Sequence, residues 1–73
     1  KANGWLAYKW VSPSQRGVPD RMYFKDGSLV IVEFKAPGKL PTPYQRAIHR
    51  RLEAAGWAVH IVDDIDKGKA LLC

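Results

Sequence analysis

The chain has 73 residues, a net charge of +5 and a pI near 9.7. This length suits one domain, which we place at residues 1–73, and a core so small needs support. The single cysteine, Cys73, excludes a disulfide within the chain, and no Cys/His spacing indicates a zinc site. We therefore expect a homodimer.

Two function classes are excluded by composition. The chain is 47% hydrophobic, which is too high for a disordered protein, and its apolar runs are too short to cross a bilayer. We expect an intracellular (cytoplasmic) protein with no membrane partner. The positive charge favours a polyanionic partner such as nucleic acid.

The first predicted elements lead into a hairpin. Residues 1–4 resemble the end of a helix, which indicates a truncated upstream helix, and Trp5–Val11 is predicted to be a strand. After a loop at Ser12–Pro19, the segments Asp20–Phe24 and Leu29–Lys35 form two strands. Asp26-Gly27 between them is typical of a two-residue type I′ turn.

A helix and a fourth strand follow. Thr42 is a good N-cap, Pro43 suits the first helical position and Gln45 completes a capping box. We expect this helix to end at Gly56 and to bury a stripe made of Tyr44, Ile48, Leu52 and Ala55.

The predicted order is (α)βββαβ(α). Its last strand is Trp57–Val62, and the short final helix is capped by Asp63 or Asp64. The helix between the third and fourth strands gives a crossover that suits parallel pairing. The expected fold is α/β, a mixed sheet flanked by helices.

The hairpin brings three charged residues together. If Asp26 and Gly27 are the turn, cross-strand pairs sum to 53, so Asp20 lies opposite Glu33 and Lys35 shares their face.

Two facing carboxylates repel, which predicts a bound cation, and oxygen ligands without a soft donor favour Mg²⁺ or Mn²⁺. A lysine beside a metal can orient water and stabilise charge on a phosphate. The alternative is a surface ion pair between Glu33 and Lys35, with Asp20 merely starting a strand.

A family resemblance rests on these residues. Gly-Val-Pro-Asp at 17–20, Val-Glu-Phe-Lys at 32–35 and Thr-Pro-Tyr-Gln at 42–45 resemble the VRR-NUC family of the PD-(D/E)xK nuclease superfamily. The resemblance spans Trp5–Val62 and implies a restriction-endonuclease-like fold and metal-dependent hydrolysis of DNA.

The resemblance also implies residue roles. Asp20 and Glu33 would bind the metal together with the carbonyl of Phe34, and Lys35 would be the catalytic lysine. Gln45 would match the family's active-site glutamine, a role that competes with the capping box for one side chain. The family's first helix carries an acidic metal-binding residue that this chain lacks.

The resemblance further implies a substrate. Stand-alone members this small resemble virus-encoded endonucleases that act as homodimers on branched DNA, including four-way (Holliday) junctions. The alternatives are a nuclease acting on linear duplex ends and a non-catalytic nucleic-acid-binding module.

The remaining candidates are basic, acidic and aromatic side chains. Arg16 and Arg21 flank the carboxylates and are candidate contacts for the scissile strand, or else counter-charges for Asp20. A further basic group could track a phosphate backbone or form a solvated helix face, and its members are Lys39, Arg46, Arg50 and Arg51.

Other residues are assigned structural roles. Core or surface positions are expected for His49 and His60, and helix capping for Asp63, Asp64 and Asp66. The three tryptophans, expected in the core or a dimer interface, are Trp5, Trp10 and Trp57.

Overall fold

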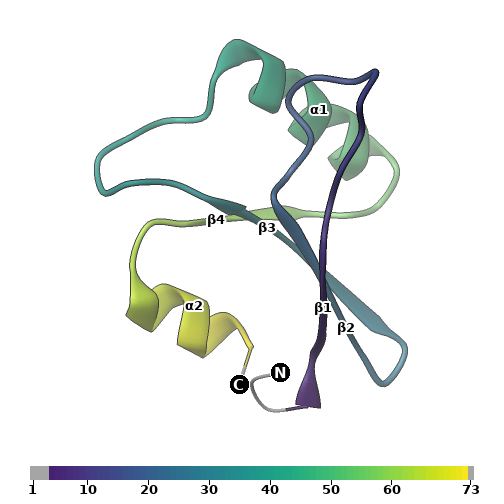
Figure 1. Cartoon of the computed structure of the whole chain (residues 1–73), viewed down its shortest axis with the longest axis vertical. Coiled ribbons are helices and arrows are strands. Elements are labelled where there is room, and N and C mark those ends of the chain that lie inside the picture. Colours follow the sequence, from purple (N-terminus) through teal and green to yellow (C-terminus); the bar gives the residue numbers. More distant parts are fainter. Residues whose placement is uncertain (1–3, 73) are drawn as a thin grey trace.

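The computed structural model describes residues 4–72, which form a four-stranded sheet and two helices (Figure 1). The elements in chain order are β1 (Leu6–Lys9), β2 (Arg21–Lys25), β3 (Ser28–Phe34), α1 (Pro43–Ala54), β4 (Val59–Val62) and α2 (Ile65–Leu71). The predicted order from the first strand onward is confirmed. The helix end predicted at residues 1–4 falls largely outside the described residues.

The sheet is mixed, as predicted. Its strands follow the order β1-β2-β3-β4, with antiparallel pairing of β1 with β2 and of β2 with β3. The pairing of β3 with β4 is parallel, because α1 carries the chain back to the other end of the sheet. The α/β fold class is confirmed and agrees with a restriction-endonuclease-like architecture.

The turn between β2 and β3 sets the register of the hairpin. Asp26 has φ 50° and Gly27 has φ 77°, and a type I′ turn requires positive φ at both of these positions. The pairs run from Lys25 with Ser28 to Arg21 with Val32, so the predicted register is confirmed along the whole of β2.

The register changes at Asp20, one residue before β2. The Asp20 N–H donates to the carbonyl of Val32 at 3.1 Å, although Val32 is already paired with Arg21. Two consecutive residues therefore oppose one, which is the arrangement of a β-bulge. The prediction that Asp20 continues the regular ladder opposite Glu33 is wrong in this detail.

Helix α1 begins and ends where the sequence predicts. The Gln45 N–H donates to the Thr42 hydroxyl at 3.2 Å, and the Thr42 N–H donates to Gln45 Oε1 at 2.8 Å, which completes the capping box. The helix ends at Ala54, and Gly56 follows with φ 98°. The conformation at Gly56 is one that glycine adopts without strain.

The buried stripe of α1 differs from the prediction. Tyr44 is 53% exposed and Ala55 is also exposed, whereas Ile48 and His49 are buried. The helix is turned so that Gln45 and His49, rather than Tyr44, face the sheet, because polar groups of β3 lie beneath it.

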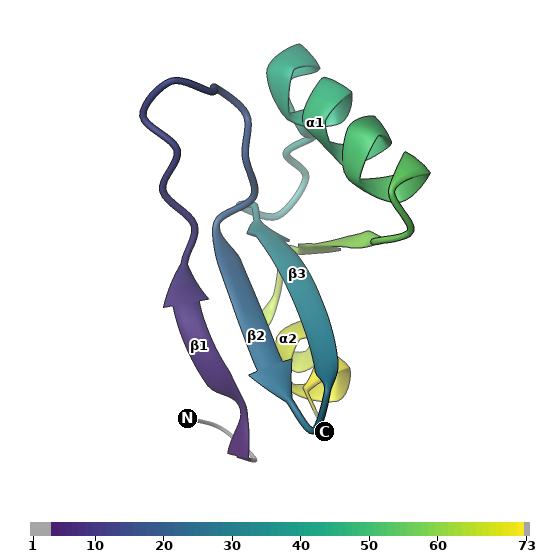
Figure 2. The same cartoon turned by 90° about the vertical axis from the view of Figure 1, so that its right-hand side faces the viewer.

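The two helices cover opposite faces of the sheet. Val32 and Glu33 alternate on β3, so their side chains point to opposite faces. Gln45 of α1 contacts Glu33, whereas α2 shares an apolar groove with Val32, and Figure 2 shows α2 behind the sheet. Among the described residues, no helix is long and apolar enough to cross a membrane.

Candidate active site

The site is centred on Glu33, the residue before the end of β3. Glu33 is only 1% exposed, which makes it one of the most buried side chains in the described part of the chain. The Gln45 Nε2 amide donates a hydrogen bond to Glu33 Oε2 at 2.8 Å. A carboxylate is seldom buried without partners, so this position indicates a specific role.

Gln45 contacts both the helix cap and Glu33. Its carbonyl oxygen accepts the hydrogen bond from the Thr42 N–H, and its amide nitrogen donates to Glu33. The prediction that the two roles of Gln45 compete is wrong. An amide has separate acceptor and donor ends, so both roles are filled at once.

Lys35 lies beside the same carboxylate. Its Nζ is 3.8 Å from Glu33 Oε2, and its side chain is 15% exposed. The Lys35 N–H donates to the carbonyl of Val62 at 2.9 Å, which fixes the lysine backbone against β4. The structure thus places the Lys35 ammonium group next to Glu33, as the spacing Glu-x-Lys predicts.

Asp20 reaches the end of β3 from the bulge. Its Oδ2 accepts a hydrogen bond from the Phe34 N–H at 2.8 Å, and its carbonyl accepts one from Trp10 N–H at 2.9 Å. These bonds hold the carboxylate near Glu33. A bulge commonly re-aims a side chain in this way beside a functional site.

The environment of Glu33 favours its protonated form when no cation is bound. Burial raises the pKa of Glu33 from 4.5 to about 7, and the neighbouring Asp20 acts in the same direction through its charge and a hydrogen bond. Lys35 opposes this shift. A carboxylate with so raised a pKa is typical of functional sites.

His49 is a site residue, although its sequence context predicts only a core or surface position. It is buried, and its Nε2 lies 3.9 Å from Glu33 Oε1. Burial lowers the pKa of His49. The helical period gave a signal for this contact, because residues four apart share a face and Gln45 was already a site candidate.

The donor set fits a hard divalent cation. Within residues 4–72, no three His, Cys, Asp or Glu side chains lie close enough together to share one metal ion. A metal ion at this site would therefore have two carboxylate ligands, Asp20 and Glu33. Mg²⁺ is commonly held by one or two carboxylates and completes its shell with water and substrate phosphate. The role of the Phe34 carbonyl stays a prediction.

Basic side chains differ in their position relative to the site. The Arg16 guanidinium lies 4.2 Å from the centre of the Tyr44 ring, next to Gln45 at the start of α1. Arg21 directly follows Asp20, is exposed and is paired with Val32. Its contact with the scissile strand stays a prediction.

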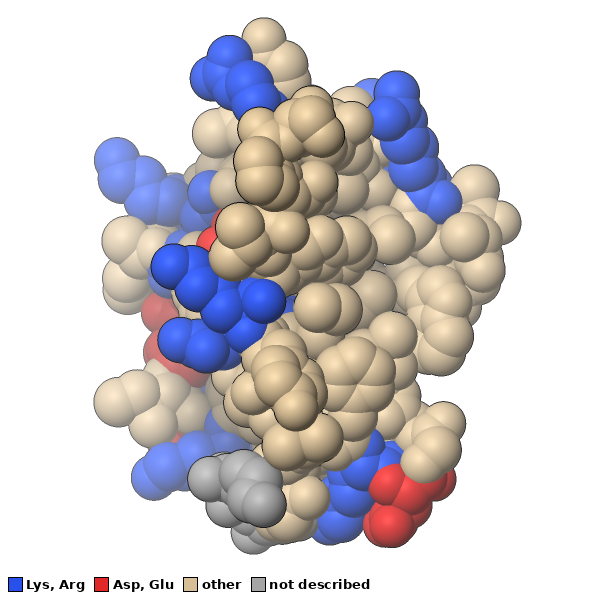
Figure 3. All heavy atoms as spheres, turned by 45° about the vertical axis from the view of Figure 1, so that its right-hand side comes forward, with Lys and Arg blue, Asp and Glu red and all other residues tan. Residues whose placement is uncertain are grey.

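The basic residues of α1 are exposed. Arg46 directly follows Gln45 and Arg50 directly follows His49 in the helix, and both are exposed, as is Arg51. Arg46 also donates to the carbonyl of Pro41 at 3.1 Å, and Lys39 is exposed in the preceding loop. Figure 3 shows basic side chains on both sides of a broad uncharged surface.

Helix capping, expected for Asp63, Asp64 and Asp66, is confirmed for Asp64. Asp64 caps α2 by accepting from the Lys67 N–H at 2.8 Å, and Asp63 pairs with Lys67 Nζ at 2.7 Å. Asp66 lies in the first turn of this helix. His60 is exposed on β4.

The tryptophans occupy three environments. Trp5 belongs to the core, where its Nε1 donates to the carbonyl of Leu72 at 2.9 Å. Trp10 is half-buried and Trp57 is 44% exposed.

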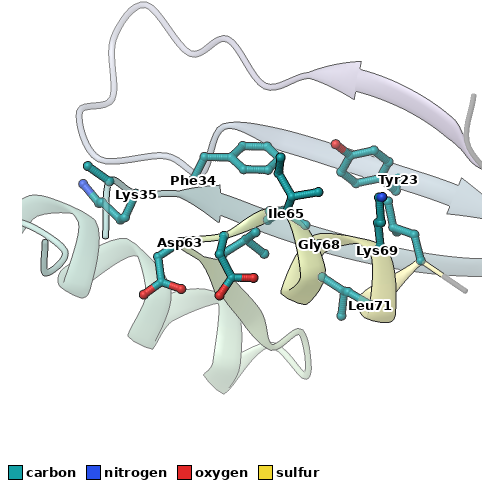
Figure 4. Close-up of a pocket in the computed structure, with 13 residues that line it drawn as sticks. Tyr23, Phe34, Lys35, Asp63, Ile65, Gly68, Lys69 and Leu71 are labelled. Carbon is teal, nitrogen blue, oxygen red and sulfur yellow. The ribbon is translucent and has the colours of Figure 1, made fainter. Parts of the chain in front are cut away.

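A groove of about 850 Å³ lies between α2 and the sheet, on the face opposite Glu33. Figure 4 shows Ile65 of α2 near Phe34, with the Lys35 amine directed away from them. The groove is lined mainly by apolar groups and so lacks the polar chemistry of the site.

The fold and the site together define a class, the α/β proteins with a restriction-endonuclease-like sheet and a carboxylate pair at the end of a central strand. No family model matches the sequence. The chain is 49% identical over 69 residues to the protein named "Putative nuclease p44" from Acyrthosiphon pisum secondary endosymbiont phage 1, a match covering 93% of this chain and 74% of that protein. The chain belongs to the family of this phage protein.

Proposed function

We propose that this protein is a nuclease that hydrolyses phosphodiester bonds in DNA with the help of Mg²⁺ or Mn²⁺. The observation that carries the proposal is the buried Glu33, held by Gln45 and placed beside Asp20 and Lys35. The phage relative named a nuclease supports it. The VRR-NUC resemblance, with Asp20, Glu33, Lys35 and Gln45 as its site residues, agrees with both.

In this proposal Asp20 and Glu33 hold the cation, with the Phe34 carbonyl as a further ligand. The Phe34 N–H fixes Asp20, and Gln45 fixes Glu33, so the two carboxylates are oriented before substrate binds. A bound divalent cation supplies a water of lowered pKa and polarises the phosphate oxygen. Burial of Glu33 strengthens its interaction with such an ion, because water screens it poorly there.

Lys35 positions the attacking water and stabilises the negative charge that develops on the phosphate. The water gives up a proton as its oxygen forms a new bond to phosphorus, the phosphorus–oxygen bond to one sugar breaks, and the released oxygen takes up a proton from solvent in exchange. Lys35 suits this work because its ammonium is a compact charge only 3.8 Å from the carboxylate.

We propose branched DNA, such as a four-way junction, as the substrate and a homodimer as the active form. A twofold dimer presents two sites to two strands. The net charge of +5 and the exposed Arg46 and Arg50 on α1 support a DNA partner. Every residue of the edge strand β1 is exposed, including Leu6 and Tyr8, which offers an apolar surface to a second copy.

The test is cleavage of a panel of labelled DNAs containing a four-way junction, a flap, a linear duplex and a single strand. We expect cleavage with Mg²⁺ or Mn²⁺, none with EDTA, and a preference for the junction. Glu33→Gln should abolish cleavage and keep DNA binding, whereas Asp66→Asn, an equal charge change on exposed α2, should cleave like the parent.

Three outcomes would contradict the proposal in different parts. Binding without cleavage in either metal would favour the non-catalytic module. Preference for duplex ends would favour the alternative substrate. A monomer by sedimentation at high micromolar concentration, with full activity, would remove the dimer.

A further inference from the structure

The contact between α1 and Glu33 contains two buried polar atoms without partners. Glu33 Oε1 and His49 Nε2 are both inaccessible to solvent, and neither has a hydrogen-bond partner within residues 4–72. They lie 3.9 Å apart, which is about 1 Å longer than a hydrogen bond. Two orphaned atoms that face each other across so short a gap indicate a bond that forms in another state of the site.

The cost of this arrangement argues against a purely structural histidine. A buried polar atom without a partner typically costs about 1–3 kcal/mol, and a leucine in this place would carry no such cost. An imidazole can carry an N–H on Nε2 both as a neutral tautomer and in its protonated form. That N–H would match the unpaired Oε1.

The geometry of α1 supports a shared task for two side chains. Gln45 and His49 are four residues apart, so they project from one face of the helix. Gln45 donates to Oε2, and His49 faces Oε1. The same helix therefore offers one donor to each oxygen of Glu33, and only the first bond is formed here.

We propose that His49 is a positioning residue for Glu33, with its Nε2–H donating to Oε1 when the site holds a divalent cation. The inference rests on the proposed function, because it assumes that Glu33 is a metal ligand. Gln45 and His49 then fix the rotation of the carboxylate, as partners behind a metal ligand commonly do. The ring needs to move by only about 1 Å.

The experiment measures Mn²⁺ binding by titration calorimetry together with thermal melting of the metal-free protein. His49→Leu should weaken Mn²⁺ binding about 10–100-fold, the usual effect of losing such a partner. The same variant should melt no earlier than the parent, because it removes a buried unpaired atom. His49→Gln keeps a donor and should recover most of the affinity.

His60→Leu is the matched control, since His60 is the other histidine of the chain and is exposed on β4. It should bind Mn²⁺ like the parent. Unchanged Mn²⁺ affinity in His49→Leu would overturn the positioning role. So would equal weakening in His49→Leu and His49→Gln that follows a fall in melting temperature, because packing alone explains that result.

Failure of the proposed function gives a different pattern. In that case the parent binds no Mn²⁺, or Glu33→Gln binds it as well as the parent does. Either result removes Glu33 as a ligand and overturns the positioning role with it. Weakened Mn²⁺ binding in Glu33→Gln, together with a loss that among the histidine variants is confined to His49→Leu, supports both.

Discussion

The helices that cover the two faces of the sheet differ in how completely the polar groups beneath and around them are hydrogen-bonded. On one face α2 is capped by Asp64, and the Trp5 indole is hydrogen-bonded to Leu72 at its far end. On the other face α1 covers Glu33, and two buried polar atoms there have no partner in the described part of the chain. The hydrogen bonds on the α2 face stabilise the fold, whereas the unpaired polar atoms on the α1 face lower its stability.

This difference teaches where the chain gives up stability. None of the described residues of α2 is buried, yet its N-terminal cap and ion pair are complete. Helix α1 is longer and better anchored, yet its buried face carries Gln45 and His49 instead of apolar residues alone. Such local cost at one face is expected where function, and not folding, selects the residues.

The largest expected effect concerns Lys35. Under the proposed function, Lys35→Ala should lower single-turnover cleavage by about a thousandfold, equivalent to about 4 kcal/mol of transition-state stabilisation. Lys35→Arg should not restore the rate, because a planar guanidinium does not reproduce an ammonium contact. Melting with Mg²⁺ should barely change.

Lys69→Ala on exposed α2 is the control for the loss of one positive charge, and it should cut like the parent. If Lys35 only neutralises buried carboxylates, its loss should instead destabilise the fold by about 3–5 kcal/mol. A Lys35→Ala variant that melts early but still cleaves DNA well would contradict the catalytic role of Lys35. The α1 face of the sheet would then have a structural role, like the α2 face.

A second effect should appear in the pH dependence of the metal-free protein. The pKa of Glu33 is raised from 4.5 to about 7 by burial and Asp20. The native state therefore holds this proton more tightly, and the contribution of Glu33 to the free energy of unfolding is intact below pH 4.5. It is lost as pH rises to about 7, and the loss is up to about 3 kcal/mol.

Melting of parent and Glu33→Gln in EDTA at about pH 5 and about pH 8, on either side of the raised pKa, measures this loss. The variant should gain stability relative to the parent at the higher pH, whereas Asp66→Asn should show no such gain. Saturating Mn²⁺ at the higher pH should restore the parent. A difference between parent and Glu33→Gln that is the same at both pH values would mean that Glu33 is not strained by its burial.

The smallest effect separates two glycines with nearly the same backbone. Gly17 has φ +86°, and a Cβ there would lie 2.5 Å from the Tyr44 backbone and 2.8 Å from Gln45 N. Gly38 has φ +80°, and a Cβ there would meet nothing within 4 Å. Each alanine carries about 1–2 kcal/mol of left-handed strain, but only Gly17→Ala must also displace α1.

We expect Gly17→Ala to be less stable than Gly38→Ala by about 1–3 kcal/mol, the usual range for overpacking. It should also lose more cleavage activity, since moving Gln45 disturbs Glu33. Urea unfolding of the two variants measures the difference. Equal stability would show that the loop before Asp20 does not hold α1 in place.

Short-range chemistry made most of the fold predictable. Asp26-Gly27 determined the turn and the β2–β3 register, and Thr42, Pro43 and Gly56 determined the bounds of α1. These signals act over a few residues, and nothing in the tertiary structure opposes them. The pairing of Glu33 with Lys35 followed from strand alternation alone.

The missed features depend on contacts between distant segments. The bulge at Asp20 carries no glycine or turn signal, because it arises from bonds to Trp10, Val32 and Phe34. The facing of Gln45 and His49 toward Glu33 depends on tertiary packing, so the apolar stripe predicted the burial of Ile48 but not that of His49. The predicted competition between the two roles of Gln45 overlooked that its amide has a separate acceptor oxygen and donor nitrogen.

The two hydrogen bonds of the Gln45 side chain tie the start of a helix to the site. Helix ends open far more often than a whole protein unfolds, and such fraying occurs without global loss of structure. When the first turn of α1 opens, the Gln45 side chain loses its hydrogen bond with the Thr42 N–H and its hydrogen bond with Glu33 at the same time. Hydrogen exchange at this one turn thus reports the fraction of time for which the site is assembled.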